Sequence, residues 1–547
     1  MLKAIRRFVH DEDQGAYGAD VIEHSIPSRL DSGETYGIRA TVRNTGSLTW
    51  RRSGPHPVDL FVLIDDELYQ KVVLPHGDVA PHTDVTFHFA LRLSKPGTHR
   101  VRLELVHHLA AWFRDRGAPG VAIDVHSEDG PRDRTALAFE RSLARNLWHF
   151  QPTSGVRRLR DGSVLPLFVA SAKGCRITDP EGHEFLDYTS GWGSTILGYA
   201  DDRIQTGIAE RLATAPLAPF PDPLEMDVSE MIAADFPSAE MVVFGKNGSD
   251  ACTVAARLAR ATTGHRQILS CGFHGWQDFS VEETGEFHRF RFNDADGFRR
   301  IYEQFRSDLA AIMIEPAGPF ISPDEGLSGD PHPAFLALLA QSARDAGALL
   351  VFDEIITGYR YRQHSVQRAT GIVPDLTCLG KALASGMPLA AVAGQARIFH
   401  DGFAKTHYCP TFKAEIYSLA AAKRAIEIYR TEPVGARIEQ IGARLKAGMN
   451  RACADLALPA ECRGPAFRFS LVFLDPDPAV RRLARTLYMQ ELLRRRIVTA
   501  NGVMLPNWSH SDADVDDTLH AVFESIDVVA SAVRRGDLDA RIEIPLL

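Results

Sequence analysis

Two short apolar runs, each ending in a charged residue, constrain the fold of this chain most. The run Leu349–Phe352 ends in Asp353, and the run Leu376–Leu379 leads through Gly380 to Lys381. Continuous apolar runs of this length are typical of strands buried on both faces of a parallel sheet. Because ligands of open α/β sheets bind at the carboxyl ends of the strands, we expect the acid and the amine to lie at one edge. The alternative is that the two strand ends carry charges that simply meet solvent.

An acid and an amine at one sheet edge are the two groups that pyridoxal phosphate requires. Lys381 is predicted to form an imine with the cofactor aldehyde and, once freed by substrate, to move a proton at the reacting carbon. Asp353 is predicted to keep the pyridine nitrogen protonated, so that the ring acts as an electron sink. The sequence therefore predicts pyridoxal 5'-phosphate as cofactor, with Lys381 and Asp353 as catalytic residues.

A glycine turn before a helix is a candidate phosphate site. An apolar run at 241–244 is followed by Asn247, Gly248 and Ser249, and then by apolar residues at helical spacing through about Thr263. A helix N-terminus presents free N–H groups to an anion, Gly248 allows close approach of the backbone, and Ser249 adds a hydroxyl donor. The alternative is an ordinary helix cap formed by Asn247 or Ser249.

Two more predicted strands end in residues that could face the same site. Phe273 and His274 follow the run 268–270, and Glu315 follows the run 310–314. The Phe273 ring can stack on a flat cofactor, and His274 could bond a cofactor oxygen. The alternatives are that Phe273 belongs to the core, that His274 is structural, and that Glu315 accepts hydrogen bonds from nearby backbone N–H groups.

The first 130 residues have a different pattern of apolar and polar residues. Apolar and polar residues alternate along 36–42, 85–93 and 101–105, and Asn-Thr-Gly and Pro-Gly breaks interrupt them. This pattern is typical of a β-sandwich, whose core we expect to hold Trp50 and Trp112. The segment also resembles a bacterial immunoglobulin-like module, through residues 44–50, 96–98 and 111–117. We expect it to serve in assembly or partner docking.

From about residue 137 to 535 the chain resembles the class III, fold-type I pyridoxal-phosphate aminotransferases, and among them most of all the glutamate-1-semialdehyde aminomutases. The motifs that carry the resemblance stand in the family's order: Asn247–Ala251, Phe273–Gly275, Glu315–Pro316, Asp353–Ile355, Thr357–Arg360, Pro374–Leu376, Gly380–Lys381 and Thr411–Phe412.

The resemblance implies a set of site residues. Those expected to bind the cofactor are Asn247, Gly248, Ser249, Phe273, His274, Glu315, Asp353, Ile355, Lys381 and Thr411. By the family pattern, Thr411 reaches the cofactor phosphate of a neighbouring subunit, which implies a homodimer. Ser190 and Trp192, within Ser190–Gly193, resemble the family's substrate-side motif. No metal site is expected.

The expected fold class is α/β: a fold-type I transferase, with a mostly parallel sheet in a large domain and a small α+β domain, preceded by an all-β immunoglobulin-like sandwich. The expected domain limits are 1–130 for the sandwich (core about 26–126), 131–195 for a linker and the first part of the small domain, 196–430 for the cofactor-binding large domain, and 431–547 for the rest of the small domain.

Three departures from the family pattern bear on the reaction. Pro410 replaces a glycine before Thr411, Gly318–Phe320 replaces a glycine-asparagine pair, and Leu505–His510 carries no acid where the aminomutase has one. They favour an aminotransferase that moves an amino group from a small-molecule donor to a carbonyl acceptor, and the fusion to a sandwich module indicates a specialised biosynthetic pathway. The alternatives are an aminomutase that shifts the group within one substrate and, more remotely, a non-catalytic scaffold or binding protein.

Bulk properties narrow the class of protein further. The net charge of −9 gives no basic face for nucleic acid. No stretch is long and apolar enough for a membrane span, and the basic start is not followed by the apolar core of a signal peptide. The seven cysteines show no paired spacing, which is typical of reduced thiols. We therefore expect a cytoplasmic protein without membrane or nucleic-acid partners.

Overall fold

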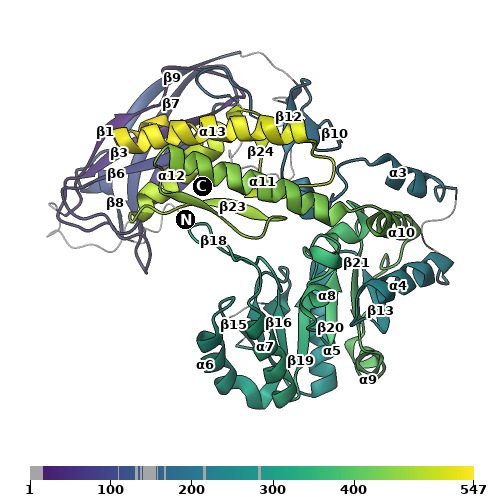
Figure 1. Ribbon diagram of the computed structural model, residues 1–547. Coiled ribbons are helices and arrows are strands. Elements are labelled where there is room, and N and C mark those ends of the chain that lie inside the picture. The colour runs from purple at the N-terminus through teal and green to yellow at the C-terminus, as the bar shows by residue number, and fades with distance from the viewer. Residues whose placement is uncertain are drawn as a thin grey trace.

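The computed structural model describes residues 16–546 except 109, 130–133, 136–137, 139–155, 157, 166–167, 214–216, 218 and 281–284. The described chain forms a β-sandwich, a large sheet covered by helices, and a C-terminal layer in which long helices pack on smaller sheets (Figure 1). None of the helices in these residues has both the length and the apolar composition needed to cross a bilayer.

The sandwich consists of two sheets. The first has the order β1 (Ala19–His24), β3 (Thr35–Asn44), β6 (Asp84–Arg92). The second has the order β2 (Arg29–Asp31), β9 (Val121–Glu128), β7 (Gly97–His107), β4 (Val58–Ile64), β5 (Glu67–Val73), with β8 (Ala111–Trp112) paired to β7. Alternate residues of β3 and β6 are buried, as the period-two pattern predicted. The all-β sandwich is therefore confirmed.

The two tryptophans of the sandwich lie in different places. Trp50 is fully buried in the core between the sheets and packs edge-on against Phe113. Trp112 is also buried, but in a separate small cluster around Phe61, and the Arg114 guanidinium lies 4.5 Å from its ring centre. The prediction that both are core residues is therefore confirmed, with Trp112 in a smaller cluster apart from the main core of the sandwich. The alternating pattern cannot tell apart the two faces of a sheet that are both covered.

The large sheet holds the two runs on which the prediction rested. Its order is β13 (Met241–Gly245), β21 (Ala390–Gly394), β20 (Leu376–Leu379), β19 (Leu349–Asp353), β16 (Leu309–Ile314), β14 (Gln267–Cys271), β15 (Phe287–Arg289). Strands pair in parallel except β21, which is antiparallel to both of its neighbours. The mostly parallel sheet is thus confirmed.

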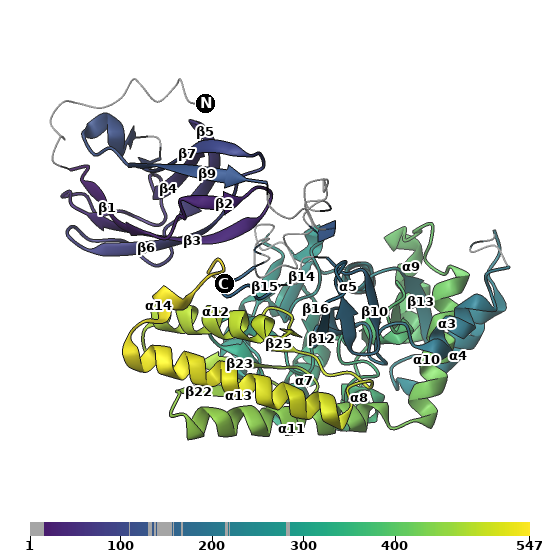
Figure 2. The ribbon, with the colours of Figure 1, turned by 90° about the horizontal axis from the view of Figure 1, so that it is seen from above.

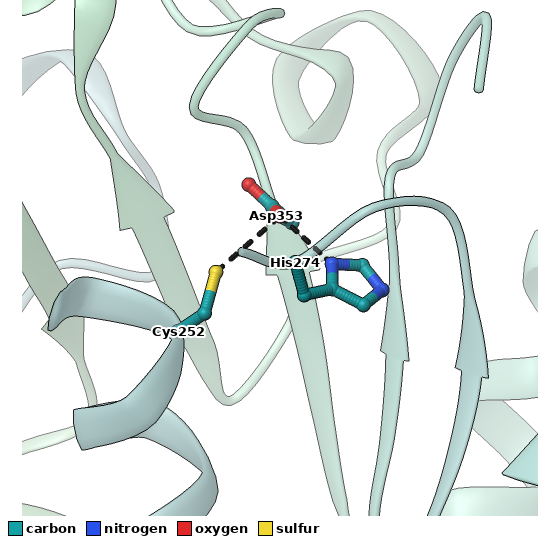
Figure 3. Close-up of side chains that lie close together, drawn as sticks. All are labelled: Cys252, His274 and Asp353. Atoms are coloured by element: carbon teal, nitrogen blue, oxygen red, sulfur yellow. Dashed lines mark hydrogen bonds and ion pairs between the residues drawn. The ribbon is translucent and has the colours of Figure 1, made fainter. Parts of the chain in front are cut away.

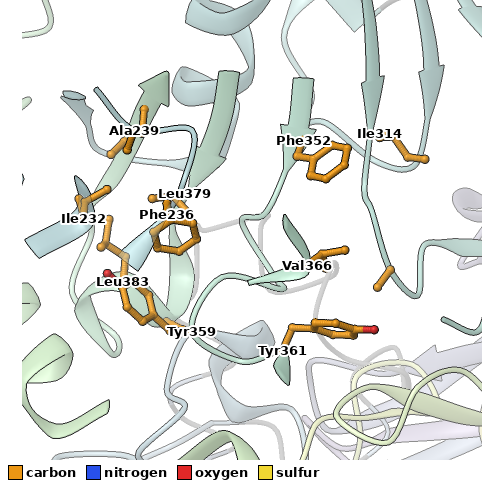
Figure 4. Packing of buried hydrophobic residues seen from close by; sticks show 14 of the residues in the cluster. Ile232, Phe236, Ala239, Ile314, Phe352, Tyr359, Tyr361, Val366, Leu379 and Leu383 are labelled. Carbon is orange, nitrogen blue, oxygen red and sulfur yellow. The ribbon is translucent and has the colours of Figure 1, made fainter. Parts of the chain in front are cut away.

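Helices cover both faces of this sheet, which explains the uninterrupted apolar runs. Leu350 and Phe352 of β19 pack in one core cluster, and Leu349 and Val351 pack in the other. Figure 4 shows part of the first cluster, in which Leu379 lies beside Phe236 and Phe352 lies on the same side of the sheet as Val366. The helices around the sheet are α3 (Asp202–Ala209), α4 (Pro223–Asp235), α5 (Gly248–Thr263), α6 (Ala295–Phe305), α7 (Pro333–Ala346), α8 (Val366–Thr370), α9 (Ala396–Thr406) and α10 (Ile416–Thr431).

Segments from both ends of the catalytic part build the C-terminal layer. One sheet has the order β10 (Ser171–Lys173), β11 (Arg176–Thr178), β12 (Glu184–Asp187), β24 (Ile497–Val498), and another has the order β22 (Ala460–Arg463), β23 (Phe469–Phe473), β25 (Val503–Met504). The helices are α11 (Val434–Asp455), α12 (Pro478–Arg494), α13 (Asp512–Arg535) and α14 (Leu538–Arg541). A short hairpin, β17 (Phe320–Ser322) and β18 (Gly326–Leu327), contacts β23 from the large sheet's side.

The three-stranded sheet of the sandwich lies against the C-terminal segment of its own chain (Figure 2). The Asp539 carboxylate, in α14, accepts hydrogen bonds from Arg39 Nη1 at 3.1 Å and pairs with His88 Nε2 at 2.6 Å. A β-carbon at Gly37 would lie 1.7 Å from the Glu543 carbonyl oxygen, so the backbones touch here. This contact fixes one face of the sandwich.

The Asp539 contact should contribute to stability in a pH-dependent way. Burial favours the neutral acid, but His88 and Arg39 outweigh it and hold the pKa of Asp539 below its ordinary value of 3.8. We expect Asp539→Asn to lower the free energy of unfolding by about 1–3 kcal/mol. Because the folded-state pKa is lowered, this difference is fully present above about pH 4 and is lost as the pH falls through the folded-state pKa.

Urea denaturation of the full-length protein at several pH values measures this difference. Asp537→Asn is the matched control, because Asp537 pairs only with the exposed Arg541 and Arg535 in the same segment and should change stability little. Equal effects of the two substitutions at pH 7 would contradict the role given to Asp539.

Candidate active site

The carboxyl ends of the large sheet's strands surround a cavity of about 370 Å³. Asp353 ends β19 and is paired in register with Cys378 of β20, three residues before Lys381. Of the residues predicted from the sequence, the cavity is lined by Asn247, Gly248, Ser249, Phe273, Glu315, Asp353, Ile355 and Lys381. The structure therefore brings together residues from the ends of five strands, β13, β14, β16, β19 and β20, as the parallel topology requires.

The turn before α5 forms a helix cap, as the alternative prediction held, and leaves backbone N–H groups without a helical partner. Asn247 Oδ1 accepts a hydrogen bond from Asp250 N at 3.0 Å, and the Asp250 carboxylate accepts one from Asn247 N at 3.3 Å, which forms a capping box. The first N–H groups of a helix have no intrahelical partner, so those of Gly248 and Ser249 remain for a ligand. A β-carbon at Gly248 would lie 2.7 Å from Cδ1 of Ile355, so a larger residue there would require the Ile355 side chain to move.

The Asp353 carboxylate is buried and fully supplied with hydrogen-bond donors (Figure 3). Its Oδ2 atom lies 2.8 Å from His274 Nδ1 and 3.4 Å from Cys252 Sγ, and its Oδ1 accepts from Ile355 N at 3.1 Å. These bonds replace water around the buried carboxylate. His274 thus lies behind the cavity wall and holds Asp353, rather than lining the cavity itself.

The buried cluster of Cys252, His274 and Asp353 has the donor atoms of a metal site, all within 4.8 Å of one another. Burial raises the pKa of the Cys252 thiol well above its ordinary value, and the nearby Asp353 charge raises it further. The thiol is therefore protonated and donates to Asp353, whereas a metal would require the thiolate. We assign the cluster to hydrogen bonding. The sequence alone did not single out Cys252, which lies one helical turn beyond Ser249.

Lys381 begins a short 3₁₀ helix, η9 (Lys381–Ala384), in the left-handed backbone region, with φ of +45°. A non-glycine residue in this region is strained and is held there by its surroundings. Desolvation, helped by the positive charge of Arg468, lowers the pKa of Lys381 to about 8, against the opposing charges of Glu315 and Asp353. A larger fraction of this amine is therefore neutral near physiological pH than for an exposed lysine.

Glu315 has the structural role considered as an alternative, and a second contact besides. Its Oε1 accepts from Phe273 N at 2.7 Å, and its Oε2 pairs with Arg468 Nη1 at 2.9 Å. Phe273 itself is exposed, with its ring at the mouth of the cavity, so it does not belong to the core. Arg468 lies in the turn between β22 and β23 and was missed from the sequence, because no local pattern places this hairpin beside the sheet edge.

Besides His274, three residues predicted for the site do not line the cavity of the single chain. Ser190, in α2 (Ser190–Gly193), is fully buried; its hydroxyl donates to Leu505 O at 2.6 Å and accepts from Asn507 Nδ2 at 3.0 Å. Trp192 is partly exposed, and Thr411 is exposed. Ser190 therefore anchors the segment beside the cavity instead of facing a ligand there. Ser194, one turn later, lines the cavity in its place.

The cavity fits pyridoxal phosphate on the chemistry of its donors. One end presents free backbone N–H groups and the Ser249 hydroxyl, which suit a phosphate. A fixed carboxylate, a lysine of lowered pKa and an aromatic ring at the mouth complete the set that the cofactor requires. These groups lie at or just beyond the ends of neighbouring strands of one sheet and line the same cavity.

Comparison with known proteins agrees with this assignment. The family model described as aminotransferase class-III matches residues 159–522. The 3-aminobutyryl-CoA aminotransferase of Cloacimonas acidaminovorans is 28% identical over 412 residues, which are 71% of this chain and 98% of the relative. The glutamate-1-semialdehyde 2,1-aminomutase of Roseiflexus castenholzii is 29% identical over 432 residues, with 72% and 97% of the two chains covered.

Solved structures give the same fold. The pyridoxal-phosphate form of the FumI protein of Sphingopyxis sp. MTA144 superposes with a TM-score of 0.63 at 25% identity, covering 70% of this chain and 94% of that one. A glutamate-1-semialdehyde aminomutase of Pseudomonas aeruginosa superposes with a TM-score of 0.62 at 21% identity, covering 72% and 94%. The predicted fold-type I architecture and the predicted cofactor, pyridoxal phosphate, are thus confirmed.

The lowered pKa of Lys381 predicts how fast the cofactor-free protein combines with pyridoxal phosphate. Only the neutral amine attacks an aldehyde, so we expect the rate to rise with pH up to a midpoint at about 8 and then level off. Stopped-flow absorbance of the apoprotein mixed with cofactor measures this profile. A lysine-containing peptide gives the reference curve. A midpoint for the protein near the ordinary lysine value of 10.5 would contradict the burial and charge argument.

Proposed function

Because the chain belongs to the class III aminotransferases, we propose that it moves an amino group from a small-molecule donor to a separate carbonyl acceptor, in a specialised biosynthetic pathway. Family membership makes the protein a pyridoxal-phosphate enzyme, so the non-catalytic scaffold hypothesis is not retained. The observation that carries the proposal is the meeting of Lys381, Asp353 and the free N–H groups of α5 in one cavity.

Each residue has a role that follows from its contacts. When bound, pyridoxal phosphate supplies an aldehyde that can take up an amino group and a ring that withdraws electrons. Lys381 Nζ, with its lowered pKa, accepts and returns the proton at the reacting carbon. Asp353, fixed by His274, Cys252 and the Ile355 N–H, would keep the ring nitrogen of the bound cofactor protonated. Gly248 and Ser249 would hold its phosphate.

Transfer between two compounds is favoured over a shift within one compound by the composition of the cavity. The carboxylates that line it are those of Glu315 and Asp353, and both already have protein partners. The segment 505–510, where the aminomutase pattern has an acid, is instead held by Ser190 through Leu505 and Asn507. The acid expected of an aminomutase is therefore missing from segment 505–510, whereas Lys381, Asp353 and the N–H groups at the start of α5, which amino transfer requires, are present.

We propose further that two chains form a homodimer in which Thr411 completes the neighbour's phosphate site. In a single chain Thr411 is exposed and outside the cavity. Large apolar side chains nearby in the sequence, or at the cavity mouth, are also exposed, namely Phe273, Trp276 and Phe412. Exposed apolar side chains around a site are typical of a protein interface, and a second copy of the chain would cover them.

A half-reaction with single amino donors tests the proposed transfer. We expect at least one simple donor to convert the bound cofactor to its amino form, with loss of the visible absorbance band, and a carbonyl acceptor to restore the band. Lys381→Ala should lose turnover by several orders of magnitude, because it removes the amine that takes up and returns the proton. Failure of every donor to bleach the band, with turnover of a single substrate retained, would favour the aminomutase.

Mixing two inactive variants tests the shared site. Thr411→Glu places a charge beside the phosphate and should weaken cofactor binding, and Lys381→Ala removes the amine. If Thr411 acts in the neighbouring site, a hybrid dimer contains one site with wild-type Lys381 and wild-type Thr411, and activity returns on mixing. Each variant mixed with itself is the control. No recovery from hybrids whose formation is verified by mass spectrometry would exclude the shared site.

A further inference from the structure

We infer that Arg468 binds a carboxylate of the amino donor, so that the enzyme takes amino acids rather than plain amines. This inference rests on the proposed amino transfer and names the substrate class for the same cavity. Arg468 lines the cavity that contains Lys381, yet it comes from the β22–β23 hairpin of the C-terminal layer rather than from the large sheet.

The guanidinium of Arg468 has N–H groups that are available to a ligand. Its Nη1 atom donates to Glu315 Oε2 at 2.9 Å and more weakly to Gly318 O at 3.4 Å. Among the described residues, Nε and Nη2 have no hydrogen-bond partner, and the side chain retains 15% of its exposure. A guanidinium with one free edge beside a cavity can bind a carboxylate in the bidentate mode.

The other cations near the cavity are already committed. Lys246 Nζ is paired with Glu415 at 2.8 Å and also contacts Ser418. Arg360 is fully buried and donates to the carbonyl oxygens of Gly193 and Pro506. Lys381 is the amine required for the reaction. Among the residues that line the cavity, Arg468 is therefore the cation available for a substrate acid.

Glu315 explains why the arginine is stable before substrate arrives. A half-buried cation without a partner would be costly, and the Glu315 carboxylate, itself held by Phe273 N at 2.7 Å, offsets part of this cost. The turn that carries Arg468 is close to the loop after Glu315, since a β-carbon at Gly318 would lie 2.8 Å from the Pro465 ring. Glu315 and an incoming carboxylate would therefore share one guanidinium. Removing the Arg468 charge should weaken the affinity for carboxylates, and removing the Glu315 charge should strengthen it.

Two measurements on the holoenzyme test the inference. The first compares the half-reaction with 4-aminobutyrate and β-alanine against butylamine and propylamine, which lack the carboxylate. The second measures binding of propionate and glutarate, which cannot react, by calorimetry. We expect the amino acids to be preferred, and Arg468→Gln to weaken the amino acids and the unreactive acids by about 10- to 100-fold while changing the amines little.

Three further variants sharpen the result. Arg468→Lys keeps the charge but not the bidentate geometry, so its loss should be intermediate. Glu315→Gln removes the competing carboxylate and should tighten propionate binding. Arg463→Gln, in the same hairpin but outside the cavity lining, is the matched control and should behave as wild type.

The outcomes separate this inference from the proposed function. If no donor of either kind bleaches the cofactor, the transfer proposal fails, and the calorimetric arm alone decides the role of Arg468. Equal loss of amines and amino acids in Arg468→Gln, or unchanged binding of propionate and glutarate, would overturn the inference. Circular dichroism of each variant establishes that the fold is intact before either comparison is made.

Discussion

The buried charge of Asp353 is the constraint on which the site depends. A carboxylate removed from water is costly unless hydrogen bonds replace its hydration. Here the replacement comes from three elements: His274 after β14, Cys252 in α5, and the Ile355 N–H after β19. The same contacts that keep the anion also fix its direction relative to Lys381. Loss of any one element would therefore disturb both the stability of the sheet edge and its chemistry.

Sequence reasoning could find the strand ends but not the contacts between them. A strand buried on both faces leaves a continuous apolar run, so Asp353, Lys381 and Glu315 could be placed at one edge from local patterns. The His274–Asp353 and Cys252–Asp353 bonds join residues 79 and 101 positions apart, and no local pattern contains that information. Ser190 was assigned to substrate by resemblance, whereas its buried hydroxyl binds the segment at Leu505 and Asn507.

The N-terminal sandwich shows the same limit more clearly. Its alternation of apolar and polar residues predicts two packed sheets, because period two describes one strand at a time. Its attachment depends on Arg39 and His88 meeting Asp539, which is 500 positions from Arg39. These residues read as ordinary surface charges in the sequence. With one face against the C-terminal segment, the remaining surface of the sandwich is what the predicted assembly or docking role can use.

The ion pair between Glu315 and Arg468 has a consequence for motion as well as for recognition. Glu315 stands on the large sheet and Arg468 on the hairpin of the C-terminal layer, so the pair joins two separately packed cores. A substrate carboxylate that binds Arg468 while its amine approaches Lys381 would span the same two parts. A ligand shifts a conformational equilibrium only by binding one state better than another. A substrate that contacts both Lys381 and Arg468 would therefore favour the relative position of the large sheet and the hairpin in which both contacts can form.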